Sequence, residues 1–279
     1  MRRFSFRILN VFTVDGDRLS GNPLCVFDDA RGLSDHEMQA LARQTNLSET
    51  TFVSPSTSAD ADVRIFTPSF EMPFAGHPTL GTASVVAAGR DSVVLSMRAG
   101  LVPVTREGTR FTLRTAQSPA TRAVTASRAE LAEMLGLPSD AVSDEPLWVS
   151  TGVEQLVIPV RTPELVKAAR PDPALLGRYA FLEARNASMA YLIAEGEPHW
   201  TVRFFFTSNG AVLEDPATGS ACANLGGWLS TRGRTPLELS LRQGEAVGRP
   251  SRLGLRVDAA GAIFVTGEVI ELGRGAIEL

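Results

Sequence analysis

The sequence predicts an α+β fold made of two similar β-rich domains, each of which encloses one buried helix. Three observations lead to this prediction. Many short strand-like segments are separated by few helices, one pattern recurs at half the chain length, and two helices consist of very small residues. The chain has 279 residues, 44% of them hydrophobic and 21% charged, so it is long enough for two globular domains of ordinary size.

Short apolar segments rich in β-branched residues are the first observation, because such segments are typical of strands. In the first half of the chain they lie at residues 6–12, 24–27, 51–53, 63–66, 93–96, 101–105 and 111–114. In the second half they lie at residues 156–160, 189–194, 201–206, 237–242, 252–257 and 262–270. We place a boundary near Ser118 and Pro119, which gives an N-terminal domain of residues 1–118 and a C-terminal domain of residues 119–266; residues 267–279 can return to the first domain.

Helices are predicted from their start signals. Two segments carry a capping box, in which a serine N-cap is followed three residues later by glutamate, and these begin at Ser34 and Ser127. The first predicts a helix over residues 35–44, and the second predicts a helix that closes at Gly136. Thr162, which is followed by proline, opens a third helix with proline at its first position.

The half-length repeat is the second observation. Residues 64–89 and 203–233 each contain an arginine-plus-aromatic strand, an irregular loop with an acidic residue and a proline, and a glycine that opens a small-residue helix. Gly219 lies 143 residues after Gly76, close to half the chain. The repeat predicts two domains related by an approximate twofold; the alternative is two unrelated strand-turn-helix units that share turn chemistry.

The small residues of the two repeated helices are the third observation. They are Thr79, Gly81, Thr82, Ala83 and Ser84 in the first, and Ser220, Ala221, Cys222, Ala223, Asn224, Gly226 and Gly227 in the second. Glycine costs a helix about 1 kcal/mol relative to alanine, so these residues make sense where strands wrap closely around the helix. The N-terminus of such a helix carries unpaired N–H groups and about half a positive charge, which suits a carboxylate.

Titratable and polar side chains gather at these helix ends. His77 lies at the first end, Glu214, Asp215 and Ser220 flank the second, and Glu49 heads an apolar strand where desolvation would raise the pKa of its carboxyl toward neutrality. Each also has a structural interpretation. Glu49 can be a solvated loop residue, His77 a donor to a carbonyl at the helix end, Asp215 the start of an Asx-turn and Ser220 a capping hydroxyl.

Composition excludes several classes of function. The net charge of −4 and the pI of about 5.5 give no basic surface for nucleic acid or an anionic membrane, and no apolar run is long enough to span a bilayer. Cys25 and Cys222 lack any CxxC spacing, which indicates no disulfide framework and favours a cytoplasmic location. No metal site is predicted, because the cysteines and histidines are not clustered.

Four segments resemble the PhzF-like phenazine biosynthesis isomerases. These are GNPLCVF (21–27), NLSETTFV (46–53), RIFTPSFEMPFAGHPTLGTA (64–83) and EDPATGSACANL (214–225), which occur in the family's order over most of the chain. The resemblance implies a diaminopimelate epimerase-like fold of two pseudo-symmetric domains, each a β-barrel-like mixed sheet around a central helix. It also implies an active site in the cleft between the domains, a homodimer, and neither metal nor organic cofactor.

The resemblance also implies roles for individual residues. Glu49 would be the acid/base that moves a proton between two carbons of the substrate, while His77 and Asp215 would orient substrate polar groups. Ser220 and the backbone of Gly76 and Gly219 would bind the carboxylate or adjacent oxygens. In all, the resemblance implies five substrate-binding residues, which are Asn22, Ser48, Gly76, Gly219 and Ser220.

The chemistry implied by the resemblance is cofactor-free isomerisation of a small unsaturated carboxylic acid. The best-known reaction of the family converts trans-2,3-dihydro-3-hydroxyanthranilate into a ketone tautomer by migration of a ring hydrogen. Two alternatives are an amino-acid epimerase or racemase with non-thiol bases, and a non-catalytic binding protein of the same fold. A thiol-dependent epimerase is not expected, because Ala75 and Thr218 occupy the positions where such enzymes of this fold carry cysteine.

Overall fold

The computed structural model describes residues 1–208 and 210–279 and divides them into two compact units. Unit 1 consists of Met1–Arg114 with Thr266–Leu279, and unit 2 of Thr115–Val265. The limits of the units lie close to the predicted domain boundaries at residues 118 and 267. Within the described residues, no helix is both long and apolar enough to cross a membrane.

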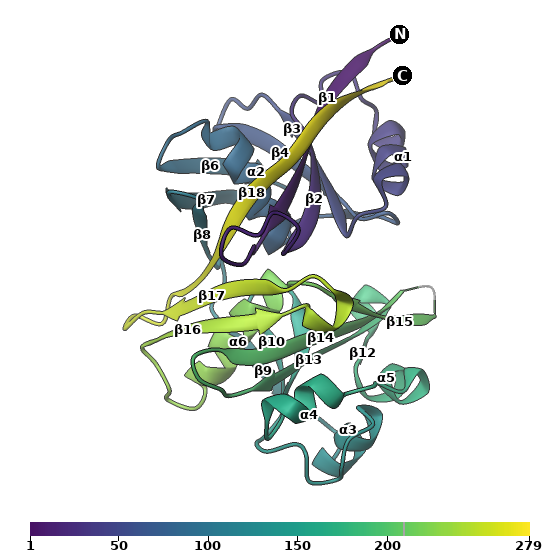
Figure 1. Cartoon of the computed structure of the whole chain (residues 1–279), viewed down its shortest axis with the longest axis vertical. Helices are drawn as coiled ribbons and strands as arrows, with labels where there is room; N and C mark the ends of the chain where they lie inside the picture. The colour runs from purple at the N-terminus through teal and green to yellow at the C-terminus, as the bar shows by residue number, and fades with distance from the viewer. Residues whose placement is uncertain (209) are drawn as a thin grey trace. The chain divides into compact units, whose positions relative to one another are not determined.

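Unit 1 is a mixed sheet that closes on itself. Its elements are β1 (Arg3–Val11), β2 (Asn22–Phe27), α1 (Asp35–Thr45), β3 (Glu49–Ser54), β4 (Ala61–Phe66), β5 (Glu71–Met72), α2 (Gly76–Ala87), β6 (Ser92–Met97), β7 (Gly100–Glu107) and β8 (Arg110–Arg114). β18 (Ile263–Glu278) enters from unit 2 and pairs with both β1 and β8, so the strands form a ring (Figure 1). The chain ends pair here through Arg2 and Leu279.

The helix α2 fills this ring. It contacts β1, β2, β3, β6 and β8, and its first eight residues, Gly76–Ala83, are all buried. A Cβ at Gly81 would lie 2.4 Å from Cδ2 of Leu24 and 3.0 Å from Cγ2 of Val11, so the strands approach too closely for a larger residue. Thr82 donates to or accepts from Thr51 at 2.8 Å, which satisfies both buried hydroxyls. The prediction of a central buried helix is confirmed for this unit.

Unit 2 repeats this architecture with more helices on its surface. Its elements are β9 (Ala120–Ala123), α3 (Arg128–Met134), β10 (Leu147–Ser150), β11 (Glu154–Pro159), α4 (Pro163–Ala168), α5 (Pro173–Tyr179), β12 (Phe181–Leu182), β13 (Ala187–Ala194), β14 (Trp200–Ser208), β15 (Ala211–Asp215), α6 (Gly219–Ser230), β16 (Leu237–Gln243) and β17 (Ser251–Val257), with short 3-10 turns at Glu183–Arg185 and Glu245–Val247. The three surface helices α3, α4 and α5 pack around an apolar cluster that includes Leu131, Val166 and Leu176.

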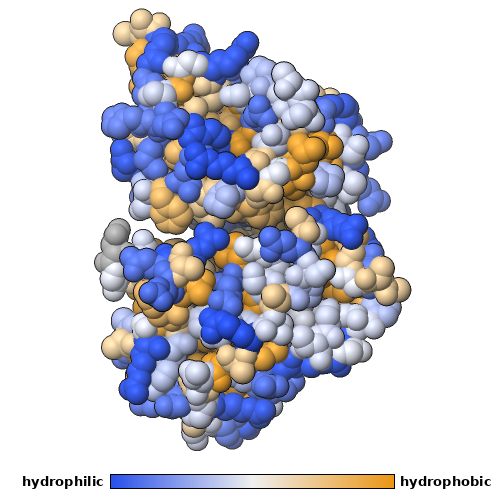
Figure 2. Space-filling view, turned by 180° about the vertical axis from the view of Figure 1, so that it is seen from behind, coloured by the Kyte–Doolittle hydropathy of each residue, from blue (hydrophilic) through white to orange (hydrophobic). Residues whose placement is uncertain are grey.

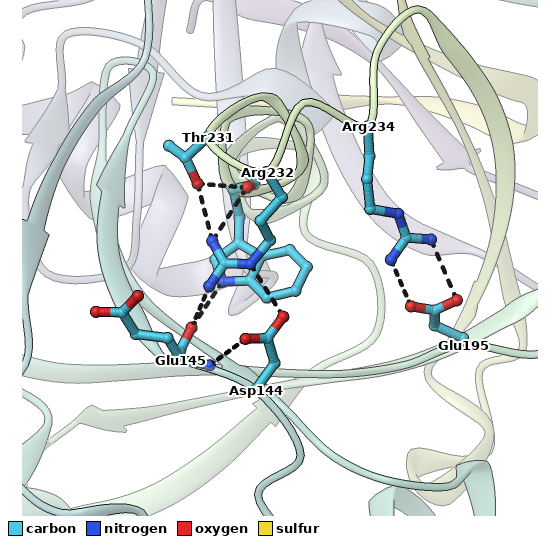
Figure 3. Close-up of polar contacts among 7 residues, drawn as sticks. Asp144, Glu145, Glu195, Thr231, Arg232 and Arg234 are labelled. Atoms are coloured by element: carbon cyan, nitrogen blue, oxygen red, sulfur yellow. Dashed lines mark hydrogen bonds and ion pairs between the residues drawn. The ribbon is translucent and has the colours of Figure 1, made fainter.

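The helix α6 is the central helix of unit 2. It contacts β9, β10, β11 and β17, and a Cβ at Gly227 would lie 2.7 Å from Cβ of Pro119. Its C-terminal end is tied to the unit by Arg232, which donates to the Glu145 carbonyl at 2.7 Å and to the Asp144 carboxylate at 3.1 Å (Figure 3). Arg232 also lies over the ring of Trp228. The helix therefore cannot shift along its axis without breaking these contacts.

The two units share one order and sense of strand pairing. In unit 1, β1 pairs antiparallel with β2, β2 parallel with β3, β3 antiparallel with β4, β4 parallel with β6, and β6 antiparallel with β7. In unit 2, β10, β11, β13, β14, β16 and β17 repeat the same sequence of senses. The predicted half-length repeat is thus a repeat of fold, and the alternative of unrelated strand-turn-helix units is wrong.

The repeat extends to one ion pair. In unit 1, Nε and Nη2 of Arg64 donate to the two oxygens of Glu71 at 2.8 and 2.6 Å. In unit 2, Nε and Nη2 of Arg203 donate to the two oxygens of Glu214 at 3.1 and 2.6 Å. Each glutamate precedes the first glycine of its central helix by five residues. Each bidentate pair therefore fixes the hairpin that leads into the helix end.

The surface of the protein is mixed in character. Figure 2 shows apolar side chains interspersed with hydrophilic ones rather than gathered into one broad area. Among the large hydrophobic residues that are well exposed are Leu19, Phe70 and Leu101. Single exposed apolar residues of this kind are normal on soluble domains.

Candidate active site

The N-termini of the two central helices differ from those of the other described α-helices. The surface helices α1, α3, α4 and α5 all have a side-chain cap, supplied by Ser34, Ser127, Thr162 and Asp172. The central helices begin after Ala75 and Thr218, and neither residue makes a side-chain cap hydrogen bond. No cap side chain therefore occupies their first N–H groups, and the N-terminus of a helix is suited to bind an anion such as a carboxylate.

Glu49 and His77 meet at the N-terminus of α2. Oε2 of Glu49, the first residue of β3, lies 2.9 Å from Nδ1 of His77, the second residue of α2. The side chains are 17% and 4% exposed. The predicted strand position of Glu49 is confirmed, and His77 bonds a carboxylate rather than a carbonyl. When Glu49 is ionised, Nδ1 must carry the proton of this hydrogen bond.

The second ring nitrogen of His77 is a polar atom with no protein partner. Nε2 is buried and makes no hydrogen bond to any residue within 1–208 or 210–279. Buried polar atoms are almost always paired, so an orphaned nitrogen beside an acid points to a ligand or water at this place. It can accept a hydrogen bond when His77 is neutral and donate one when it is protonated.

The other predicted residues of unit 1 lie around this pair. Asn22 is buried at the start of β2, and strand alternation puts it on the same face as Leu24, which contacts α2. Gly76 is the first residue of α2 and is buried. Ser48 is exposed and directly precedes Glu49. Unit 1 thus brings the predicted residues Glu49, Gly76 and His77 to one helix end. Asn22 lies two residues before Leu24, which pairs with Glu49, and Ser48 directly precedes Glu49.

In unit 2, Asp215 lies at the end of β15 in a turn held by hydrogen bonds. Its Oδ2 accepts from Oγ1 of Thr218 at 2.6 Å. Gln243, which is buried on β16, donates to the Asp215 carbonyl at 2.9 Å and to Oγ1 of Thr218 at 3.0 Å. The turn interpretation of Asp215 is therefore correct in part, and its carboxylate stands half-buried beside the uncapped end of α6. Sequence reasoning did not identify Gln243.

Ser220 and Gly219 form the first turn of α6. Gly219 is buried and Ser220 is half-buried. Ser220 is the second helical residue, so the interpretation of its hydroxyl as an N-cap is wrong, because the N-cap position belongs to Thr218. Its Oγ accepts a hydrogen bond from Nε2 of Gln155 at 3.0 Å.

The Glu49–His77 pair has no counterpart among the described residues of unit 2. Thr50 pairs with Phe66 as Ala190 pairs with Phe205, so Met189 takes the place of Glu49 in unit 2. The repeat places Ser220 where unit 1 has His77. At the end of α6, the positions equivalent to Glu49 and His77 therefore carry Met189 and Ser220, and the nearby carboxylate is that of Asp215 on β15.

Neither cysteine is suited to act as a base. Cys25 and Cys222 are free and buried. Burial, reinforced by the charge of Asp28, raises the pKa of Cys25 to about 12. Burial also raises the pKa of Cys222. Thiolates at neutral pH are thus disfavoured at both positions.

A family model described as phenazine biosynthesis-like protein matches residues 9–272. The chain belongs to the PhzF family. The PhzF assignment predicted from the four motifs is confirmed, and it covers nearly the whole sequence.

Named members of the PhzF family share substantial identity with this chain. An uncharacterized isomerase of Pasteurella multocida is 38% identical over 98% of this chain and 94% of its own. The trans-2,3-dihydro-3-hydroxyanthranilate isomerase of Pseudomonas aeruginosa is 36% identical over 92% of this chain and 94% of its own. The prediction of an enzyme of the isomerase class is confirmed at the level of the family.

Solved structures confirm the fold class. A predicted epimerase from Pseudomonas aeruginosa matches with a TM-score of 0.82 and 29% identity over 99% of both chains. A hydroxyproline epimerase from Agrobacterium vitis matches with a TM-score of 0.66 over 99% of this chain and 91% of that one, at 13% identity, which shows the fold alone. The diaminopimelate epimerase-like fold predicted from the resemblance is therefore correct; the roles of the individual site residues stay predictions.

Proposed function

We propose that this PhzF-family protein is an isomerase that moves a hydrogen between two carbons of a small unsaturated carboxylic acid, with Glu49 as the acid/base. The observation that carries the proposal is the 2.9 Å contact between Glu49 and His77. Both side chains are largely buried, and they lie at the uncapped N-terminus of α2. A base held by a hydrogen bond next to unpaired N–H donors is the arrangement that such a proton transfer requires.

The proposed reaction conserves all atoms and needs no redox step. The Glu49 carboxylate takes a proton from an allylic carbon, and the electron pair of the broken C–H bond enters the conjugated system. Negative charge then builds on the substrate carboxylate and its neighbouring atoms. The Glu49 carboxylic acid returns the proton to a second carbon, which regenerates the starting form of the enzyme.

Two effects, general acid–base catalysis and preorganised hydrogen-bond donors, lower the activation free energy of this reaction. General acid–base catalysis typically contributes a factor of roughly 10² to 10⁴. Preorganised donors aimed at the developing charge can contribute as much again. In this proposal His77 orients Glu49 through Nδ1 and meets a polar group of the substrate through Nε2, while the first turn of α2 supplies N–H donors.

The substrate class is proposed from the relatives. The proteins of Pseudomonas aeruginosa and Pseudomonas chlororaphis, 36% and 34% identical to this chain, are named trans-2,3-dihydro-3-hydroxyanthranilate isomerases. We propose an acid of this kind, with Asp215 and Ser220 contributing further polar contacts. A shared cleft, a homodimer and a cytoplasmic location stay predictions of the resemblance and of the cysteine usage.

An epimerase is the weaker candidate for the same residues. Inversion at one carbon uses a proton donor and a proton acceptor on opposite faces. Unit 2 has Met189 and Ser220 at the places where unit 1 has Glu49 and His77, which supports a single-base reaction. A non-catalytic binding protein would not need the buried acid–histidine pair.

The decisive test is the isomerisation rate of Glu49→Gln. Native protein and variant are incubated with trans-2,3-dihydro-3-hydroxyanthranilate, and conversion is followed by proton NMR. We expect conversion by the native chain and a loss of about 10²-fold or more in the variant. Glu107→Gln, at an exposed carboxylate of β7, is the matched control and should keep full activity. Native-like rates for Glu49→Gln would overturn the assignment of the base.

A further inference from the structure

Behind Ser220 lies a chain of buried amides that the proposed function has not used. Nε2 of Gln155 donates to Oγ of Ser220 at 3.0 Å, and Oε1 of Gln155 accepts from Nδ2 of Asn224 at 2.8 Å. Asn224 is fully buried within α6, and Gln155 is 2% exposed on β11. The chain thus runs from the middle of the central helix to its N-terminal end.

The direction of this chain is fixed by backbone groups. Oδ1 of Asn224 accepts from the Thr151 N–H at 2.9 Å and from the Thr151 hydroxyl at 2.8 Å. Nδ2 of Asn224 donates to the Val153 carbonyl at 2.8 Å as well as to Gln155. A backbone N–H can only donate and a carbonyl can only accept, so the Asn224 amide has one allowed orientation. All four of its hydrogen-bonding positions are then occupied.

This orientation passes to Gln155 and then to Ser220. Because Asn224 presents an N–H to Gln155, the oxygen of Gln155 must face Asn224 and its NH₂ must face Ser220. The Ser220 oxygen therefore accepts, and its own proton must point elsewhere. Among residues 1–208 and 210–279 no acceptor receives that proton.

We propose that Gln155 and Asn224 are positioning residues that fix Ser220 as a hydrogen-bond donor toward a carboxylate or carbonyl oxygen of the ligand. The inference rests on the proposed function for the identity of the ligand, but not for the direction of the chain. A hydroxyl held in this way donates without first rotating, which is the condition for preorganised stabilisation of negative charge. Buried polar networks that are fully satisfied also hold one geometry.

The direction of the chain can be tested without any ligand. Neutron diffraction from crystals of the full chain in D₂O locates the deuterons on Ser220 and Gln155. We expect a deuteron on Nε2 of Gln155 that points at Oγ of Ser220, and an Oγ deuteron that points away from Gln155. An Oγ deuteron directed at Gln155 would overturn the proposal.

The consequence for binding is tested with anthranilate, a stable planar carboxylate, by isothermal titration calorimetry. We expect Ser220→Ala to weaken binding roughly tenfold or more, because a hydrogen bond to a charged group is lost. Gln155→Glu keeps the bond from Asn224 but turns the hydroxyl of Ser220 toward the new carboxylate. In that background, Ser220→Ala should change the Kd less than about twofold.

Two controls separate this effect from charge and from simple loss of structure. If Gln155→Glu acted only by repelling the anion, Ser220→Ala would cost the same in both backgrounds, and the positioning role would be wrong. Gln155→Met removes the hydrogen bond without adding a charge and frees the hydroxyl of Ser220 to rotate, so the effect of Ser220→Ala should fall below tenfold. An unchanged tenfold effect in this background would show that Gln155 does not position Ser220. Absence of anthranilate binding to the native chain would count against the proposed substrate class, and the neutron map would still decide the direction of the chain.

Discussion

At the residue scale, burial has different consequences for groups with and without a partner. His77 and Glu49 are largely buried and hold each other, which leaves one nitrogen for a ligand. Cys25 and Tyr191 are buried among apolar side chains, and within the described residues neither forms a pair like that of His77 and Glu49. In the proposed function the Glu49–His77 pair takes part in the reaction, whereas Cys25 and Tyr191 should be inert. Both expectations can be tested by changing or modifying single side chains.

The cysteines should be unreactive in the folded protein. A thiol with an ordinary pKa is partly ionised at pH 8, whereas Cys25 has a pKa of about 12, so its reactive thiolate should be about 10³-fold scarcer. We expect iodoacetamide at pH 8 to leave Cys25 and Cys222 unmodified in native buffer and to label both in guanidinium. The rate in native buffer should rise as pH increases toward 12. Rapid labelling of folded protein, read by mass spectrometry, would contradict this account.

Tyr191 should be replaceable by phenylalanine without loss of stability. Its hydroxyl is fully buried and has no hydrogen-bond partner within the described residues, and burial raises its pKa. An unsatisfied buried hydroxyl costs about 1–3 kcal/mol. We expect Tyr191→Phe to leave the free energy of unfolding unchanged or raise it by about 1 kcal/mol in urea titrations.

Tyr179→Phe is the matched control for this substitution. The Tyr179 hydroxyl donates to Glu130 at 3.1 Å, so its removal should lower stability slightly. A fall of more than about 1 kcal/mol for Tyr191→Phe would show that its hydroxyl makes a stabilising hydrogen bond.

At the scale of elements, the two central helices are shaped by what surrounds them rather than by helix propensity. Their glycines are unfavourable in an isolated helix, but the strands and Pro119 leave no room for a side chain at Gly81 or Gly227. Their N-termini also lack the side-chain caps that the surface helices possess. The glycines let the strands pack closely on the helices, and the absence of side-chain caps leaves the helix ends accessible to a ligand in the proposed function.

The same glycine-to-alanine change should therefore have opposite effects in two helices. Gly227→Ala in α6 places a Cβ 2.7 Å from Cβ of Pro119 and 3.0 Å from Val149, and should destabilise unit 2 by about 1–3 kcal/mol. Gly177→Ala in α5 meets no atom within 4 Å and should stabilise the protein by about 0.5–1 kcal/mol. Chemical denaturation of both variants checks the signs. Stabilisation by Gly227→Ala would contradict the close wrapping of α6.

Elements with strong local signals were predictable from the sequence, and short ones were not. The capping boxes at Ser34 and Ser127 are both present, and each predicted strand is found. The helix α5 was missed although Asp172 and the following proline give the same start signal that predicted the equally short helix α4, so its signal was present in the sequence. Strands such as β5 and β12 have two residues and carry no pattern at all.

At the scale of the whole molecule, one fold occurs twice in the chain, whereas the polar groups at the two helix ends differ. The bidentate arginine–glutamate pair and the central helix occur in both units. Within the described residues, the acid–histidine pair is found in unit 1 and the amide chain behind Ser220 in unit 2. Repeats of this kind keep the packing and let the two helix ends take different roles.

The two copies of the ion pair should contribute unequally to stability. Arg203 and Glu214 are 8% and 7% exposed, so Glu214→Leu leaves a buried guanidinium with backbone carbonyls as its remaining acceptors and should cost about 3–5 kcal/mol. Arg64 is 26% exposed and keeps a second partner, Asp35 at 2.5 Å, so Glu71→Leu should cost about 1 kcal/mol. Equal losses in thermal or urea unfolding would contradict this ranking.

Sequence reasoning named two candidate residues that lie in contact, but it did not name the buried amides that support Ser220. Glu49 and His77 were predicted from motif and position, and they lie in contact. Gln155 and Asn224 were missed because their partners are 65 to 73 residues away in the chain. A glutamine inside the apolar strand at 154–159 was the available signal, since a buried amide needs partners that only the tertiary structure reveals.

The most direct measurement of the central claim is the face of the substrate on which hydrogen moves. Isomerisation of trans-2,3-dihydro-3-hydroxyanthranilate in D₂O, with deuterium NMR of the product, reports where the returned proton arrives. One acid/base group, Glu49, predicts that any deuterium enters on the face from which hydrogen was removed, and that Glu49→Gln abolishes its entry. Deuterium on the opposite face, or unchanged labelling by Glu49→Gln, would contradict the account.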